Sequence, residues 1–138
     1  MKVFNILFVL VLSFSQSCQG QEKENTVSLD YSARTRGFQY SLLLKNNVLN
    51  ITKNGEISTL ELSKEQLSDI NTLISKIDFT KIESELSEEK AAVDRVIPAK
   101  FNLQFNKKEY NYNFEHNNSP SNLQELLNYL ENLTNLKE

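Results

Sequence analysis

Apolar and polar side chains alternate along the first part of the chain. The alternation begins at Val27 and Leu29, and it returns in residues 38–44, 49–51 and 57–62. A period of two residues is typical of strands that bury one face. The pattern therefore predicts a four-stranded meander. Three turn-forming sequences separate its strands: Arg34-Thr35-Arg36-Gly37, Lys45-Asn46-Asn47 and the strong hairpin signal Asn54-Gly55.

A helical period follows the fourth run. Ser63-Lys64-Glu65-Gln66 matches a capping box, in which the Ser63 and Gln66 side chains bond to each other's backbone. We expect Phe79 and Ile82 to pack in a short turn after this helix. The apolar residues of the helix recur on one stripe: Leu67, Ile70, Leu73, Ile74 and Ile77.

Two further alternating runs and a second helix complete the pattern. The runs flank the turn Asn106-Lys107-Lys108 and predict a hairpin of residues 101–105 and 110–114. Pro120 or Ser121 begins the last helix. Residues 83–95 form the most polar internal stretch, and we expect them to be a loop or a partly helical excursion. The apolar stripe of the last helix is Leu123, Leu126, Leu127, Leu130 and Leu133.

These elements predict a single α+β domain over residues 27–138. Two helices with one apolar stripe each, and six alternating strands, pack most economically as one antiparallel sheet with both helices on the same face. The other face could dock a partner, although any open sheet presents such a face to water. Its predicted residues are polar: Ser28, Asp30, Gln39, Ser41, Asn102, Gln104, Asn111 and Asn113.

The N-terminal segment has the features of an export signal. Residues 3–14 form an apolar stretch of 12 residues after Lys2, and a membrane-spanning helix needs about 20. Ser15-Gln16-Ser17-Cys18 follows and resembles a bacterial lipobox, with Ser15 where that motif usually has Leu. The resemblance implies a signal peptide over residues 1–17 and lipidation of Cys18. Residues 18–26 would then be the lipidated cysteine and a polar tether.

The lipobox resemblance also implies a location. Loose lipoboxes are common in the Bacteroidota, and the content of Asn, Lys and Ile suits an AT-rich genome of that group. We therefore expect an outer-membrane lipoprotein that faces the periplasm or the cell surface. Cleavage after Gly20 is the alternative, and it would discard Cys18 and yield a secreted protein.

Composition excludes several classes of function. The formal net charge is −3, which leaves no electrostatic footprint for nucleic acid. With one cysteine and one histidine, an internal disulfide is impossible and a Cys/His metal cage nearly so. The domain has only Gly37 and Gly55, both predicted turn residues, so it has no Gly-rich phosphate loop. We expect no cofactor and no metal.

Candidate catalytic residues are few. His116 could act as a general base at the end of the last strand, but we favour a solvated histidine because no Ser-His-Asp arrangement is evident. Glu88, Glu89 and Asp94 could bind calcium, but without a calcium-binding loop a solvated run of charge is favoured. An enzyme is therefore the less favoured interpretation.

Aromatic residues of the second hairpin offer another candidate site. Tyr110 and Tyr112, with Phe101 and Phe105 across the turn, could form a stacking platform for sugars or bases. Aromatics at a period of two on paired strands more often form cross-strand pairs of the core. The core interpretation is therefore favoured.

The element order and the turn Arg34-Thr35-Arg36-Gly37-Phe38 distantly resemble emfourin-type domains over residues 27–133. These are small bacterial proteins, some of which inhibit thermolysin-like metalloproteases. The resemblance implies a protease inhibitor as one alternative function. The resemblance assigns an inhibitory role to no residue of this chain.

Arginine is rare in the chain, which has three arginines among 15 basic residues. Arg34 and Arg36 lie in the first predicted turn, and Arg95 lies in the polar stretch. Arginine is enriched at binding hot spots, so these residues and Phe38 form our candidate contact patch, with random placement as the alternative. A first strand that leaves a membrane tether would carry Arg34 away from the lipid.

The expected function is that of a lipid-anchored envelope protein with a small, non-catalytic binding domain. Its partners would be the membrane, through the lipid, and another envelope protein. An immunity or accessory protein for a neighbouring gene product is a further alternative to the protease inhibitor.

Overall fold

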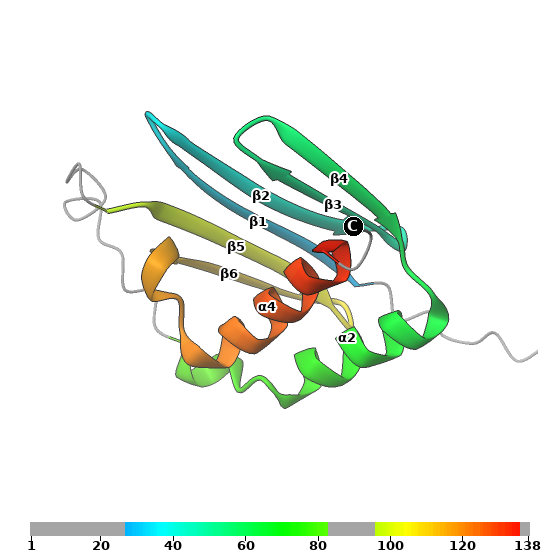
Figure 1. The fold of residues 1–138 in the computed structure, drawn as a ribbon. Coiled ribbons are helices and arrows are strands. Elements are labelled where there is room, and N and C mark those ends of the chain that lie inside the picture. Colours follow the sequence, from blue (N-terminus) through cyan, green and yellow to red (C-terminus); the bar gives the residue numbers. More distant parts are fainter. Residues whose placement is uncertain (1–26, 83–95, 136–138) are drawn as a thin grey trace, which may run out of the picture.

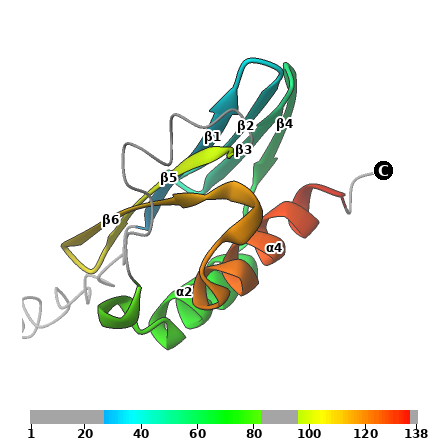
Figure 2. The same cartoon turned by 90° about the vertical axis from the view of Figure 1, so that its left-hand side faces the viewer.

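Six antiparallel strands form one sheet, and two α-helices cover one of its faces (Figures 1 and 2). The computed structural model describes residues 27–82 and 96–135. This arrangement confirms the predicted α+β class and adds two short 3-10 helices. In chain order the elements are β1 (Ser28–Thr35), β2 (Phe38–Lys45), β3 (Val48–Lys53), β4 (Glu56–Glu61), α2 (Lys64–Lys76), η1 (Phe79–Lys81), β5 (Pro98–Phe105), β6 (Lys108–Glu115), η2 (His116–Asn118) and α4 (Ser121–Asn135).

The strands lie in the order β4-β3-β2-β1-β5-β6. The first four form the predicted meander, and the β5–β6 hairpin pairs with the other side of β1. Tyr31 of β1 therefore has two neighbours in the sheet, Leu42 of β2 and Phe101 of β5. The alternation of the sequence did not predict this placement, and it leaves β4 and β6 as the two edges.

Three of the four hairpin turns use the positive φ angles of a type I′ turn. Asn54 and Gly55 have φ angles of 51° and 95°. The turns at Asn46-Asn47 and Asn106-Lys107 also have positive φ at both central positions. Asparagine tolerates this region of backbone space well, and glycine reaches it without strain. The predicted turns are thus confirmed.

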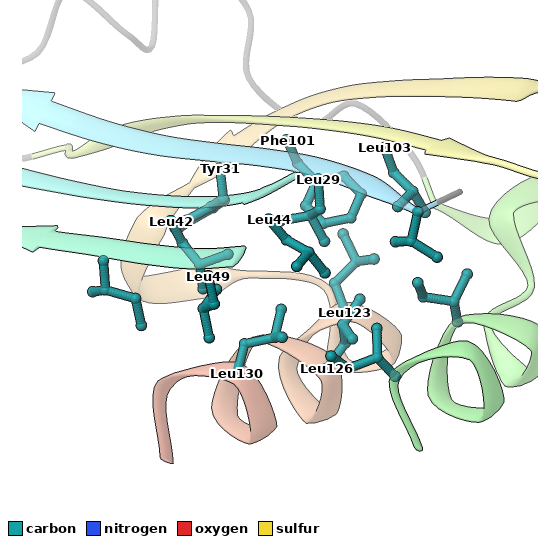
Figure 3. Close-up of a cluster of buried hydrophobic side chains, with 14 of the residues drawn as sticks. Leu29, Tyr31, Leu42, Leu44, Leu49, Phe101, Leu103, Leu123, Leu126 and Leu130 are labelled. Atoms are coloured by element: carbon teal, nitrogen blue, oxygen red, sulfur yellow. The ribbon is translucent and has the colours of Figure 1, made fainter. Parts of the chain in front are cut away.

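The core lies between the helices and the face of the sheet that they cover, which we call the inner face. The predicted capping box begins α2, because Ser63 Oγ accepts from the Gln66 N–H at 3.2 Å and Gln66 Oε1 accepts from the Ser63 N–H at 2.8 Å. Figure 3 shows the leucines of α4 directed toward the strands. The largest fully buried side chains are Tyr31, Phe101, Phe114, Leu29, Leu42, Leu44, Leu49, Ile70, Ile74, Leu103, Leu123 and Leu126.

Aromatic residues of the β5–β6 hairpin belong to this core. Phe101 is fully buried and pairs with Tyr112, whose hydroxyl donates to the carbonyl of Phe79 at 2.8 Å. The ring of Phe79 stacks on Tyr110 at 4.0 Å between centroids. These contacts confirm the prediction of core pairing, although Phe105 lies opposite Lys108 in the register.

The opposite face, which we call the outer face, carries the predicted polar residues. Asp30, Asn102 and Asn111 are exposed and adjacent across β1, β5 and β6. Two apolar side chains interrupt this face: Leu43 is 40% exposed and Ile57 is 70% exposed. No helix in residues 27–82 and 96–135 is long and apolar enough to cross a membrane.

Candidate functional site

A pocket of about 210 Å³ opens on the inner face, at the end of the sheet that holds the β1–β2 turn. Strands β1, β2 and β3 form one wall, the chain after β6 forms a second, and α4 forms the third. We call it the His116 pocket. Its lining residues are Tyr31, Phe38, Tyr40, Lys53, His116, Ser119, Gln124, Leu127, Asn128 and Glu131.

Three aromatic rings and one hydrogen bond position His116. The Tyr31 hydroxyl lies 2.6 Å from Nδ1 of His116. The ring centroids of Phe38, Tyr40 and Tyr31 lie 5.1, 5.5 and 5.9 Å from that of the imidazole. His116 also donates its backbone N–H to the carbonyl of Ile97 at 2.8 Å. The interpretation of His116 as a solvated residue is therefore wrong: it is half-buried and held on several sides.

Burial sets the charge of this cluster. It lowers the pKa of His116 below the ordinary value, and the nearby Glu131 carboxylate only partly opposes this effect. Burial raises the pKa values of both Tyr31 and Tyr40, and Glu131 raises them further. At neutral pH the imidazole is therefore uncharged and both phenols keep their protons.

The hydrogen positions follow from the burial of Tyr31. Its side chain is 2% exposed, and the part of the chain that the structure describes offers its hydroxyl no acceptor other than His116 Nδ1. The Tyr31 hydroxyl therefore donates to Nδ1, since a buried donor without an acceptor is costly. In a neutral imidazole the hydrogen is then on Nε2. His116 thus offers one free N–H donor at the pocket.

Several other polar groups of the pocket have no partner among residues 27–82 and 96–135. Within the described ranges, Lys53 and Glu131 form no ion pair, and the Tyr40 hydroxyl makes no hydrogen bond. Ser119 and His116 are not hydrogen-bonded to each other, so these two do not form a nucleophile–base pair. Among residues 27–82 and 96–135, no group of three or more side chains could hold a metal ion.

The structure divides the contact patch that the sequence predicted. Phe38 lies on the inner face, where it is partly buried and lines the pocket. Arg34 pairs with Gln39 on the outer face, and Arg36 is exposed in the turn. Arg95 lies outside the described residues, as do Cys18 and the acidic residues Glu88, Glu89 and Asp94.

Sequence reasoning missed most of the pocket. The alternation that includes Leu29 and Phe38 indicates only core positions for Tyr31 and Tyr40, and no pattern of the sequence singles out Lys53 or Glu131. One signal was available: Tyr31 and Tyr40 occupy inward positions of adjacent strands, where a hairpin register places them within reach of each other. The rings lie 5.9 Å apart.

No protein-family model, no curated protein and no solved structure matches this chain. The resemblance to emfourin-type domains and the immunity-protein alternative stay predictions.

Proposed function

We propose that this chain is a lipid-anchored protein of the bacterial cell envelope whose domain binds a macromolecule and catalyses no reaction. The observation that supports the proposal is the position of the His116 pocket. β1 begins at Ser28 and ends at Thr35, so the β1–β2 turn lies at the opposite end of the sheet from the predicted tether. The rise of a strand makes this separation about 20–25 Å.

The pocket has the composition of a binding site. It is concave, it combines aromatic walls with a few polar groups, and it holds a histidine in one orientation. Lys53, Tyr40 and Glu131 leave hydrogen-bonding capacity unused by the described part of the protein. A domain tethered through Cys18 would present this pocket away from the membrane, where a large partner can reach it.

Site-specific photo-crosslinking in the producing cells tests the proposal. A photoreactive amino acid replaces Arg36 in the β1–β2 turn or, as the matched control, Lys107 in the β5–β6 turn. Both positions are exposed turn residues at opposite ends of the sheet. We expect adducts of high molecular mass from position 36 and few from position 107. Equal adducts from both positions, or none from either, would contradict the proposed binding site.

A further inference from the structure

We infer that the His116 pocket binds one neutral sugar unit of an envelope glycan. This inference rests on the proposed function and specifies the chemistry of the macromolecule. Four properties of the pocket support it: its size, its charge, its hydrogen-bonding groups and its aromatic wall.

The size of the pocket limits the ligand to a single small ring or group. Its volume of about 210 Å³ is below the roughly 300–1,000 Å³ that is usual for pockets that hold drug-sized ligands. One unit of a polymer fits such a pocket while the rest of the polymer remains outside.

The charges of the pocket favour a neutral ligand. Lys53 and Glu131 contribute one charge of each sign, and neither forms an ion pair within the described part of the chain. His116 is uncharged because burial lowers its pKa. Opposite charges in one pocket give no net attraction for an anion or for a cation, whereas a neutral polar ligand can bond to both groups.

The uncharged polar groups that line the pocket can form hydrogen bonds with the hydroxyls of a sugar. Gln124 and Asn128 each offer an amide donor and an amide acceptor, Tyr40 offers a hydroxyl, and His116 offers the Nε2 hydrogen. A sugar hydroxyl both donates and accepts, so adjacent hydroxyls of one ring can satisfy this mixed set. A carboxylate can use only the donors among them, and an ammonium group can use only the acceptors.

The aromatic wall suits the remaining surface of a sugar. Phe38 and Tyr40 on the strand wall and His116 on the adjoining wall line the pocket with aromatic rings, and the imidazole centroid lies 5.1 and 5.5 Å from those of Phe38 and Tyr40. A sugar ring has a C–H face that packs on aromatic carbon and an edge of hydroxyls that needs polar partners. The outer face of the sheet is also polar, but it has no aromatic residue in the described ranges. The pocket is therefore the better site for a sugar.

Saturation-transfer NMR with the full mature chain tests the inference. The protein is kept in a zwitterionic detergent, because detergents with sugar head groups would compete. The probes are glucose, galactose, mannose and N-acetylglucosamine, and the comparison probe is the zwitterion leucine. We expect saturation transfer to at least one sugar and none to leucine. Transfer to leucine alone would overturn the inference.

Two variants with the same substitution locate the site. Asn128→Leu removes an exposed amide of the pocket, and Asn111→Leu removes an exposed amide of the outer face. We expect the first to raise the dissociation constant about fivefold or more, as for the loss of one hydrogen bond, and the second to leave it unchanged. Tyr40→Phe, which removes only a hydroxyl, should weaken binding in the same direction. The reverse order for the two asparagines would place the sugar on the outer face and overturn the inference.

The crosslinking experiment separates the two proposals. If no sugar binds but adducts still form at position 36, the partner is of another class, such as a protein, and only the sugar inference fails. If adducts are also absent, the proposed function fails with it.

Discussion

The Tyr31 hydroxyl and His116 Nδ1, which lie 2.6 Å apart, join residues separated by 85 positions in the chain. Tyr31 belongs to a central strand of the sheet, and His116 begins the 3-10 helix after the edge strand β6. The bond therefore connects the middle of the sheet to the segment that leads into α4. It also fixes which nitrogen of His116 is free at the pocket.

Removal of the Tyr31 hydroxyl tests this bond. Tyr31→Phe should lower the free energy of unfolding by about 1 kcal/mol, since a buried hydrogen bond is lost. The pKa of His116 should rise, because its neutral form loses a donor. Chemical denaturation measures the first effect, and an NMR titration of the imidazole measures the second.

Tyr129→Phe is the matched control for Tyr31→Phe. The Tyr129 hydroxyl donates to Asp69 at 3.0 Å in an exposed contact between α4 and α2, where water can replace the bond. The control should change stability less and leave the pKa of His116 unchanged. A similar rise of that pKa in both variants would contradict the proposed role of Tyr31.

Stability should fall as the pH falls below that of a neutral buffer. The folded protein binds a proton at His116 less readily than the unfolded chain, because burial lowers the pKa from 6.5. The stability that depends on a neutral His116 is fully present above about pH 6.5, and it is lost as the pH falls through the lowered pKa of the folded state. Tyr31, Phe38, Tyr40 and Glu131 face the imidazole, and of these only Glu131 opposes the shift.

Chemical denaturation at several pH values between about 7 and 5 measures this dependence. His116 is the only histidine of the chain, so the variant His116→Gln should show a flatter profile in this window. A variant with the same slope as the wild type would assign the pH dependence to another group.

Replacement of Gly55 in the β3–β4 turn should destabilise the protein more than replacement of Gly37 in the β1–β2 turn. Gly55 has a φ of 95°, whereas Gly37 lies outside the left-handed region, and a Cβ would meet no atom within 4 Å at either position. Gly55→Val should therefore destabilise the protein by about 1 kcal/mol or more through backbone strain alone. Gly37→Val is the control and should have the smaller effect on the thermal midpoint. Equal effects would show that the strain argument is wrong.

Lipidation of Cys18 is tested by metabolic labelling with an alkyne fatty acid. The wild-type chain should carry the label and partition with membranes, and Cys18→Ser should lose both properties. The sequence predicts this from the position of the single cysteine after the apolar segment. Equal labelling of the two chains would exclude Cys18 as the anchor.

The arginines of the first turn give a test of the predicted contact patch. Arg34 and Arg36 are exposed and form no ion pair with another described residue, so the double variant Arg34→Ala/Arg36→Ala should keep its unfolding temperature. If the two arginines are hot spots of the contact, the affinity of the double variant for the partner should fall by about fivefold or more, which corresponds to about 1 kcal/mol. The measurement uses the partner that crosslinking identifies. If the affinity for this partner is unchanged, the arginines lie outside the contact and the binding site is limited to the pocket.

Local features of the fold could be predicted from the sequence because each depends on a few neighbouring residues. The capping box of Ser63 and Gln66, the type I′ turn of Asn54 and Gly55, and the stripe of α4 are examples. The pairing of β5 with β1 could not be predicted, because it depends on which sheet edge the second hairpin meets. No local pattern distinguishes β1 from β4 as that edge.

The candidate site was harder to predict for the same reason. His116 is polar and follows a strand, which locally indicates exposure, yet tertiary packing surrounds it with Tyr31, Phe38 and Tyr40. Alternation does separate Arg34 from Phe38, since their strand positions face opposite sides.

Because β1 lies inside the sheet, it gains its two neighbouring strands at different stages of folding. Tyr31 pairs with Leu42 within one hairpin, but with Phe101 only across 70 positions. Local pairings form before distant ones, because closing a long loop costs more chain entropy. During synthesis, β1 is thus the first of the six strands to be made, and it gains its second neighbour only when β5 is made. Until β5 is made, the free edge of β1 can pair with another chain. Tyr31 also lacks its hydrogen-bond partner His116, which follows β5 and β6 in the chain.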